Sequence, residues 1–267
     1  MRILLTGTGA ADGVPAMFAD SEVSEYARTH GGKEMRLRAS ALVDDVLRID
    51  FPADTLAQIH RFGLRAKDWK AILITHSHDD HLDVKELQYF LPPFVPLEIP
   101  RPVIYGNEAV LKVLGEMYGE GFQKKELKSF QKEEICGYEV IPIRAYHKLD
   151  EESLNFLIRK DGKTLLYATD TGYYQQETWD FLRDWKLDLA IMECTDGFAP
   201  TEYWGHLSCE DFLRVVEKMR QLGCVSEKTK FVTTHHAHAG MATHKALEEF
   251  FLPHGIDVGF DGMLLEI

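Results

Sequence analysis

Short apolar runs alternate along the chain with stretches whose apolar positions recur at helical spacing. The runs predict strands at residues 2–6, 41–49, 71–75, 103–105, 139–143, 154–159, 164–169, 187–192, 230–234 and 258–266. The amphipathic stretches, several of which end at Gly, predict helices at residues 54–62, 84–90, 108–118, 176–185, 209–223 and 243–252. The strands come in blocks of mostly antiparallel pairs with helices between them, which is consistent with two sheets sandwiched by helices.

Length and composition favour one layered α/β domain over residues 1–267. The chain has 267 residues, of which 45% are hydrophobic and 11% aromatic, so it can bury a sizeable core. No window approaches the roughly 18 uninterrupted apolar residues that a membrane span needs. The first residues lead directly into Gly-rich turn chemistry instead of a leader segment. We therefore expect a cytoplasmic protein without a membrane partner.

The charge and the cysteines exclude several classes of partner. A formal net charge of −13 repels a polyanion at long range, which argues against a general nucleic-acid binder and favours small substrates. A local basic patch could still serve a small phosphate. The four cysteines lie far apart and offer neither a zinc ribbon nor a recognisable disulfide frame. The early glycines Gly7, Gly9 and Gly13 lack the spacing of a dinucleotide-binding fingerprint, so we interpret them as a turn that lines a cleft.

A run of polar residues directly after the apolar stretch 71–74 carries the strongest chemical signal. Between His76 and His81, three imidazoles and two carboxylates fall within six residues. Imidazole and carboxylate together suit zinc, manganese or iron, and such a cluster facing one cavity repels itself without a cation. The run therefore predicts a dinuclear metal site, the usual arrangement for displacement at phosphorus or carbonyl carbon. The alternative is a solvated His-rich loop.

These residues resemble the signature His-x-His-x-Asp-His of the metallo-β-lactamase superfamily of hydrolases. The signature is matched by His76, His78, Asp80 and His81, and later motifs of the family are matched by His147, Asp170 and His235. The resemblance implies the family's fold, a four-layer αββα sandwich of two mixed sheets. The pattern of strands and helices alone does not give that topology.

Within the superfamily, the chain looks most like the phosphoribosyl 1,2-cyclic phosphate phosphodiesterases that accompany the carbon-phosphorus lyase pathway. The likeness runs nearly end to end through segments 5–9, 13–16, 170–172, 205–208 and 258–263. One departure concerns a cysteine cluster that holds a separate structural zinc in the best-known members. Residues 17–32 contain no cysteine, so His238 lacks those partners and we predict no structural zinc. The departure also weakens the inference that the substrate is the same.

The resemblance assigns roles to the matched residues. It implies two divalent ions, zinc or manganese with iron as a further possibility. One ion would be held by His76, His78 and His147, the other by Asp80, His81 and His235, and Asp170 would bridge both together with a solvent-derived hydroxide. Asp80 is also expected to be catalytic, and His206 is the candidate general acid that protonates the leaving oxygen. The alternative for His206 is a surface histidine near a helix N-terminus, with Ser208 as the N-cap.

Other assignments have alternatives. His235 is preferred as a ligand over His236 and His238 because it is the first residue to follow the apolar run 231–234. Asp50 either orients a ligand imidazole or is an ordinary turn aspartate. The cations Lys148, Arg36 and Arg38 either hold a terminal phosphate or are solvated surface residues.

The favoured function is a metal-dependent phosphodiesterase that acts on a small cyclic or nucleotide-like phosphate ester, with 5-phosphoribosyl 1,2-cyclic phosphate as the favoured substrate. One alternative is a nuclease of the superfamily that acts on RNA or DNA ends, which the acidic balance disfavours. Thioester or lactam hydrolysis and a non-catalytic metal-binding module are further alternatives. A homodimer is possible.

Overall fold

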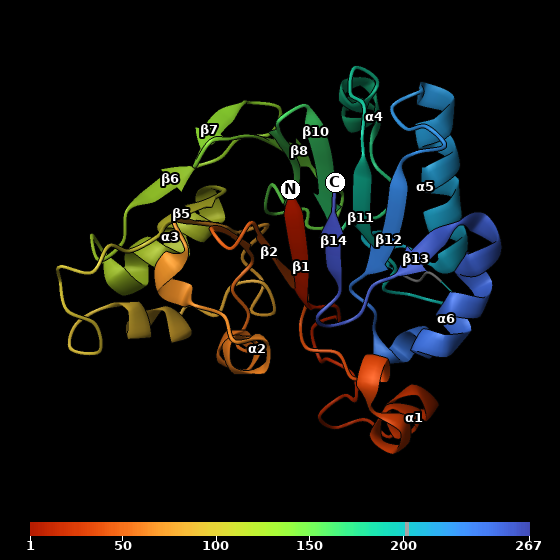
Figure 1. Cartoon of the computed structure of the whole chain (residues 1–267), viewed down its shortest axis with the longest axis horizontal. Coiled ribbons are helices and arrows are strands. Elements are labelled where there is room, and N and C mark those ends of the chain that lie inside the picture. Colours follow the sequence, from red (N-terminus) through yellow and green to blue (C-terminus); the bar gives the residue numbers. More distant parts are fainter. Residues whose placement is uncertain (201–202) are drawn as a thin grey trace.

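Alternate side chains along the central strands face two different cores, and this alternation builds the layers of the molecule. In β10 (Lys163–Ala168), Leu165 and Tyr167 pack in the core between two sheets, whereas Leu166 and Ala168 pack against helices. The structure is a computed structural model that describes residues 1–200 and 203–267. Its two seven-stranded sheets lie face to face with helices outside them (Figure 1).

The first sheet contains, in spatial order, β14 (Leu264–Glu266), β1 (Arg2–Gly7), β2 (Ser40–Val43), β3 (Leu47–Ile49), β4 (Ala71–Leu73), β5 (Val103–Gly106) and β6 (Lys124–Glu126). The second contains β13 (Ile256–Val258), β12 (Lys230–Thr234), β11 (Leu189–Glu193), β10, β9 (Leu154–Lys160), β8 (Tyr138–Arg144) and β7 (Glu133–Ile135). The helices are α1 (Glu22–His30), α2 (Thr55–Phe62), α3 (Glu108–Tyr118), α4 (Gln176–Leu182), α5 (Cys209–Leu222) and α6 (His244–Phe251). Short 3-10 helices occupy Gly32–Glu34, Ala66–Asp68, Glu86–Phe90, His238–Gly240 and Leu252–His254.

Three apolar cores separate the four layers. One core joins the two sheets, a second joins the second sheet to α4, α5 and α6, and a third joins the first sheet to α2 and α3. Trp179 of α4 and Phe212 of α5 are fully buried in the second core, and Val110 of α3 is fully buried in the third. Burial of large side chains contributes about 1.5–3 kcal/mol each, so the three cores hold the sandwich together. The predicted αββα architecture of two mixed sheets is confirmed.

Two predicted strands are in fact pairs of strands, and the predicted pairing was wrong. The range 41–49 is a hairpin of β2 and β3, because Asp44 and Asp45 both adopt positive φ and turn the chain. The range 258–266 covers the end of β13 in one sheet and β14 in the other. Strands are not mostly antiparallel: among the described residues, each sheet has three parallel and three antiparallel pairs.

The carboxyl ends of several strands meet at one edge of the sandwich. β3 and β4 are parallel neighbours in the first sheet, and β10, β11 and β12 are parallel neighbours in the second. Parallel strands deliver the residues that follow them to the same edge, which is where α/β folds form their sites. In the described part of the chain, no helix has both the length and the apolar character needed to cross a membrane.

Candidate metal centre

Four loops at this edge bring the seven predicted ligands together. The loop after β4 carries His76, His78, Asp80 and His81, and the other loops carry His147 after β8, Asp170 after β10 and His235 after β12. The ligand atoms form groups whose members lie within 4.8 Å of one another. The first loop belongs to one sheet and the other three belong to the second, so the cluster lies between the sheets.

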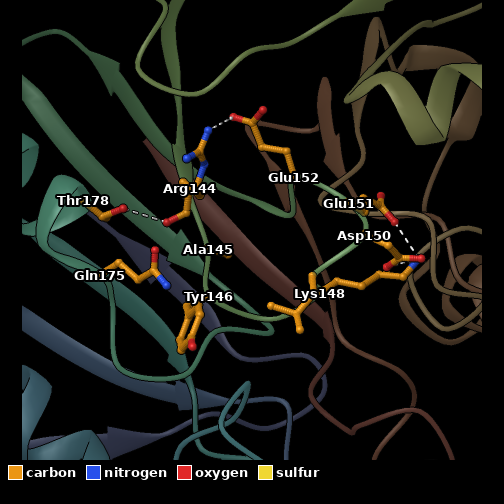
Figure 2. A pocket seen from close by; sticks show the side chains of 10 residues that line it. Arg144, Ala145, Tyr146, Lys148, Asp150, Glu151, Glu152, Gln175 and Thr178 are labelled. Atoms are coloured by element: carbon orange, nitrogen blue, oxygen red, sulfur yellow. Dashed lines mark hydrogen bonds and ion pairs between the residues drawn. The ribbon is translucent and has the colours of Figure 1, made fainter.

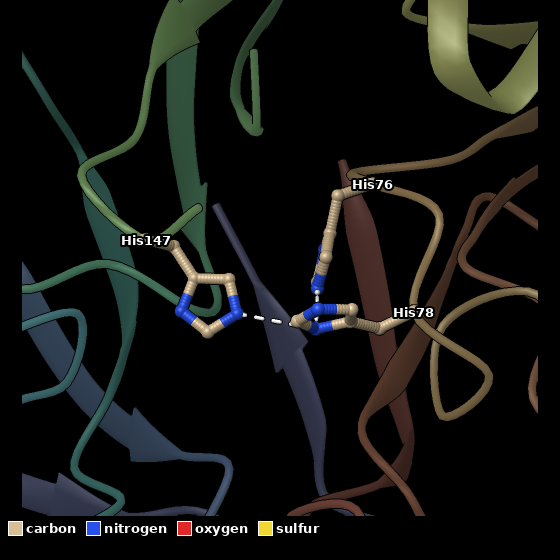
Figure 3. A group of neighbouring side chains, drawn as sticks. All are labelled: His76, His78 and His147. Atoms are coloured by element: carbon tan, nitrogen blue, oxygen red, sulfur yellow. Dashed lines mark hydrogen bonds between the residues drawn. The ribbon is translucent and has the colours of Figure 1, made fainter. Parts of the chain in front are cut away.

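The first group consists of three imidazoles, which Figure 3 shows pointing toward one another. Nε2 of His76 lies 2.9 Å from Nδ1 of His78, and Nε2 of His147 lies 3.3 Å from the same atom. Three neutral imidazole nitrogens around one point form a binding set that suits zinc and other borderline divalent ions.

The second group combines two imidazoles with two carboxylates. Nε2 of His81 contacts Oδ2 of Asp170 and lies 3.2 Å from Oδ2 of Asp80. Nε2 of His235 lies 3.3 Å from Oδ1 of Asp170 and 3.6 Å from Oδ2 of Asp80. Asp170 also reaches the first group, since its Oδ2 lies 3.7 Å from Nε2 of His76. Its carboxylate therefore lies between the two groups.

Hydrogen bonds on the far side of three of the imidazoles aim these rings into the cluster. Nδ1 of His81 donates to Asp50 at 2.7 Å, and Nδ1 of His147 donates to the backbone oxygen of Gly205 at 3.2 Å. Both bonds place the proton on Nδ1 and leave the Nε2 lone pair facing the cluster. Nδ1 of His235 is held in the same way by the Thr195 hydroxyl at 2.9 Å.

The chemistry of these donor atoms fits a cation. His81 Nε2, Asp170 Oδ2 and His235 Nε2 are buried and find no hydrogen-bond partner among residues 1–200 and 203–267, although buried polar atoms are normally satisfied. Burial by itself lowers the pKa of His81, but the carboxylates of Asp80 and Asp170 raise that pKa well above its ordinary value. Burial raises the pKa of Asp170, yet the imidazoles of His235 and His81 hold it well below its ordinary value. The carboxylates of Asp80 and Asp170 thus favour a positive charge at this site.

Three residues of the site have positive φ angles, a backbone conformation that residues other than Gly rarely adopt. The φ angles are 60° for Asp50, 50° for Asp170 and 56° for His235. Each of these residues follows a strand within two positions. The side chains of Asp170 and His235 lie in the cluster, and that of Asp50 lies behind His81. Such strain persists only where surrounding structure imposes it, and it gathers at functional sites.

His206 lies next to the cluster and is held by a buried glutamate that the sequence analysis missed. Its Nδ1 donates to Oε1 of Glu193 at 2.8 Å and lies 3.6 Å from Oδ1 of Asp170. Burial alone lowers the pKa of His206, but the Glu193 carboxylate raises it to about 9. Glu193 is fully buried and also accepts from the backbone nitrogens of Thr171 and Leu207. Its place at the end of the apolar strand β11 was the signal that could have revealed it.

A second missed residue, Glu151, connects the ligand loops. Oε1 accepts from the Ser77 backbone nitrogen at 2.8 Å and from the Asn107 amide at 2.7 Å. Oε2 accepts from the Ser77 hydroxyl at 2.6 Å and from the Lys148 ammonium at 2.9 Å. Ser77 lies between His76 and His78, Lys148 follows His147, and Asn107 caps α3. Glu151 therefore fixes two ligand segments against one helix, although no apolar strand precedes it to mark it in the sequence.

The alternatives left open by the sequence are resolved in several cases. Of the three late histidines, His235 joins the cluster. His236 is buried beside the Thr233 hydroxyl, and His238 contacts Asp12 at 2.7 Å and Ser21 at 3.0 Å. Asp50 is more than a turn aspartate, since it accepts from Nδ1 of His81 and thereby orients an imidazole of the cluster.

The three candidate cations differ from one another. Arg36 is neither a surface residue nor a phosphate ligand, because it is buried and donates to Thr8 and to the Gly259 backbone oxygen. Lys148 is paired with Glu151, and Arg38 is half-buried beside Asp54.

Two cavities flank the edge that carries the cluster. One, of about 380 Å³, is lined by residues 144–146, 148–152, Gln175 and Thr178, and Figure 2 shows its Arg144 and Lys148 already paired with carboxylates. The other, of about 450 Å³, is lined by Ala11, Arg38, Ala53, Asp79, Asp80, residues 82–85 and Met117. Asp80 lines the second cavity and also belongs to the cluster, so this cavity adjoins the cluster directly.

A family model described as the beta-lactamase superfamily domain matches residues 41–236. Among solved structures, the chain resembles a diphosphatase from the PhnP family, with 23% identity and a TM-score of 0.80 over 100% of this chain and 97% of that chain. It also resembles Zn²⁺-bound PqqB from Methylobacterium extorquens, with 16% identity and a TM-score of 0.77 over 100% of both chains. A third similar structure is the short form of human tRNase Z, with 16% identity and a TM-score of 0.67 over 100% of this chain and 99% of that chain. None of the curated proteins compared with the chain matches it. Likeness at these identities shows the fold, and chemistry must be argued from the site.

Proposed function

Since this chain belongs to the β-lactamase superfamily and is a hydrolase of the metallo-β-lactamase fold, we propose that it is a phosphodiesterase that binds two divalent ions. The proposed substrate is a small cyclic or nucleotide-like phosphate ester, and 5-phosphoribosyl 1,2-cyclic phosphate is the favoured one. The observation that carries the proposal is the convergence of seven His and Asp side chains on two adjoining groups, with an imidazole beside them that can give a proton.

The residues divide into two binding sets and a bridge. His76, His78 and His147 would hold one ion, and Asp80, His81 and His235 would hold the other. Asp170 would bridge them, in keeping with its carboxylate lying between the groups. When bound, a pair of divalent ions lowers the pKa of a water toward about 7 and neutralises charge on the phosphoryl oxygens. Zinc and manganese both suit this ligand set, and so does iron.

His206 would supply the proton that the leaving oxygen needs. Opening a cyclic phosphate produces an alkoxide, which is a poor leaving group unless it is protonated. With Nδ1 bound to Glu193, the proton on Nε2 is free to be donated. The Glu193 carboxylate keeps His206 charged at neutral pH, because it raises the pKa to about 9. Glu193 acts through His206 and is a positioning residue.

A small substrate fits the charge of the protein better than a nucleic acid does. The net charge of −13 opposes the approach of RNA or DNA, and nucleases need a basic groove or arm. The resemblance to human tRNase Z is one of fold at 16% identity. Small phosphate esters meet less repulsion, since they carry few charges. The homodimer and the cytoplasmic location stay predictions.

The test is a competition between substrates with a metal measurement beside it. Purified protein of known metal content is assayed with 5-phosphoribosyl 1,2-cyclic phosphate, cyclic nucleotides, bis(4-nitrophenyl) phosphate and short RNA. We expect about two ions per chain and turnover of the small diesters, with activity lost in Asp170→Ala and kept in the control Asp257→Ala, an exposed aspartate of edge strand β13. Stoichiometric metal without turnover would instead favour a metal-binding module. Full activity of Asp170→Ala would refute the role of the bridge.

A further inference from the structure

Three aromatic side chains that the proposed chemistry does not use gather beside the metal-binding cluster. Tyr146 directly precedes His147, and Tyr203 and Trp204 come shortly before His206. The ring of Trp204 contacts both tyrosines, since its centroid lies 4.2 Å from that of Tyr146 and 5.0 Å from that of Tyr203. Tyr146, Tyr203 and Trp204 are called the aromatic platform below.

Tyr203 borders both a predicted metal ligand and the predicted proton donor. Its ring centroid lies 5.8 Å from that of His147 and 5.5 Å from that of His206. A general acid must lie within about 3 Å of the oxygen that it protonates, so the group attached to the leaving oxygen lies beside His206. That group would therefore meet the ring of Tyr203, which is 40% exposed.

The ring of Tyr203 is held in place before a substrate binds. Its hydroxyl donates to the backbone oxygen of His147, and a Cβ on Gly205 would overlap the ring, so the ring packs closely against the backbone there. The next residue is held as well, because the Trp204 backbone oxygen lies against Gly172. A ring that is already ordered loses little freedom on binding, which favours stacking with a planar partner.

Two cations on this side of the cluster are paired and so are unavailable to a second anionic group. Tyr146 lines the cavity of about 380 Å³ in Figure 2, whose Arg144 and Lys148 are paired with Glu152 and Glu151. An anion would have to displace these carboxylates, whereas an uncharged planar ring would not. Aromatic side chains stack with any nucleobase, since each base has a π face. The cavity also has the size of a small-molecule site, about 300–1,000 Å³.

We propose that the aromatic platform is a subsite for a nucleobase on the substrate's leaving group, and that Tyr203 determines the preference for that base. The inference rests on the proposed phosphodiesterase function and narrows its substrate class to the nucleotide-like members. A cyclic mononucleotide carries both the diester and the base. 5-Phosphoribosyl 1,2-cyclic phosphate has no base, so it would use the metal-binding cluster and gain nothing from the platform.

The kinetic test compares substrates with and without the base. For the metal-loaded enzyme, the discrimination is the ratio of kcat/KM for adenosine 2′,3′-cyclic phosphate to that for methyl riboside 2,3-cyclic phosphate. Tyr203→Leu is expected to lower this ratio about tenfold, the order of effect when one base–aromatic stacking contact is lost. Tyr203→Phe removes the bond to His147 but keeps the ring, so it should keep the ratio.

Tyr173→Leu is the matched control for the loss of a tyrosine ring. Tyr173 is 36% exposed, close to the value for Tyr203, but its ring packs against Trp179 of α4 and Arg214 of α5. The ratio of kcat/KM should therefore stay the same in this variant. An unchanged ratio in Tyr203→Leu as well would overturn the subsite.

A binding measurement separates this inference from the proposed function. Calorimetry gives the affinities of the metal-loaded protein for adenosine 5′-monophosphate and ribose 5-phosphate, which share the sugar and the phosphate and differ in the base. We expect wild type and Tyr173→Leu to prefer the nucleotide about tenfold and Tyr203→Leu to lose most of this preference. That result without hydrolysis of any diester would support the subsite and contradict the phosphodiesterase. The same preference in Tyr203→Leu and Tyr173→Leu would overturn the subsite and leave the phosphodiesterase unaffected.

Discussion

At the scale of single residues, a variant of His206 can distinguish a loss of proton donation from a general structural defect. Replacing His206 with Ala removes the proton donor to the leaving oxygen, and general acids are worth about 10²–10⁴ in rate. We expect kcat for 5-phosphoribosyl 1,2-cyclic phosphate to fall about hundredfold or more. The fall for bis(4-nitrophenyl) phosphate should be much smaller, because its leaving group is stable as an anion.

Two further variants control this prediction. Glu193→Gln should produce part of the same substrate-dependent loss, since Gln cannot hold His206 charged. His254→Ala, which removes an exposed imidazole, should leave both substrates unaffected. Equal losses on the two substrates in His206→Ala would contradict a role in protonating the leaving group and would point to a positional defect.

Asp50 acts on the metal-binding cluster through its hydrogen bond to His81, and it also accepts from the backbone nitrogen and the hydroxyl of Thr75. Asp50→Asn weakens the acceptor for Nδ1 of His81 and so the orientation of its Nε2. Loss of such a partner typically costs about 10–100-fold in metal affinity. Competition with a chromophoric chelator measures the change. Asp45→Asn is a matched control, because it makes the same substitution at nearly the same backbone angle on the surface; equal metal affinities in the two variants would count against the orienting role.

At the scale of elements, the sequence predicted the strands and helices that have a clear apolar periodicity. It missed those that are short or mostly charged. The run 230–234 and the helix 108–118 were predicted with correct bounds, because each has a clear apolar pattern. Strands β6 and β7 have three residues each, mostly charged, and leave no such pattern. Helix α1 was missed although Ser21 caps it, because it buries few apolar residues.

The site was more predictable than the pairing of strands. The seven residues that meet in the cluster could be named because the run from His76 to His81 has the composition of a metal site, and because His147, Asp170 and His235 match later motifs of the family that the chain resembles. Glu151 could not be found in this way, since its role depends on three segments that meet only in the folded chain.

Glu151 is expected to hold the ligand loop and the segment of His147 in register. Glu151→Ala leaves the Ser77 nitrogen, the Asn107 amide and the Lys148 ammonium without their buried acceptor, which should cost about 1–3 kcal/mol of stability. Metal affinity should fall with it, whereas Glu151→Gln should retain part of both. Chemical denaturation and metal competition measure the two effects. Glu152→Gln, a change at a carboxylate paired with Arg144 at the surface, is the control, and equal effects of the two Gln variants would refute the connection.

Gly172 controls how closely the segment before His206 approaches the loop of Asp170. A Cβ on Gly172 would meet the Trp204 backbone oxygen at 1.8 Å, so Gly172→Ala must displace residues 204–206. We expect lower kcat and lower stability. Gly115→Ala is the opposite case, because Gly115 lies inside α3 and the added Cβ would have no described atom within 4 Å apart from its chain neighbours and the backbone of the same helix. This change should stabilise by about 0.5–1 kcal/mol. Thermal unfolding with kinetics checks both, and a Gly172→Ala variant as active and stable as wild type would contradict the close approach.

At the scale of the whole molecule, bound cations would join the two sheets. The ligand loop after β4 belongs to the first sheet, and His147, Asp170 and His235 belong to the second. A ligand that binds only the folded state stabilises it by about 4 kcal/mol at a thousandfold excess over its Kd. In a chain of this size, such a change corresponds to about ten degrees in Tm. Chelation of the metal-loaded protein should therefore lower Tm by about that amount.

The control for this prediction is treatment of the Asp170→Ala variant with the same chelator, because this variant lacks the carboxylate that would bridge the two ions. Without the carboxylate of Asp170, which reaches both groups, Asp170→Ala should already unfold at a lower temperature, and the chelator should lower its Tm little further. Calorimetric unfolding with metal analysis of each sample gives both numbers. If the metal left the wild-type protein completely and Tm stayed the same, the apolar core between the sheets would stabilise their packing without a contribution from the metal. The seven side chains would then serve the chemistry alone.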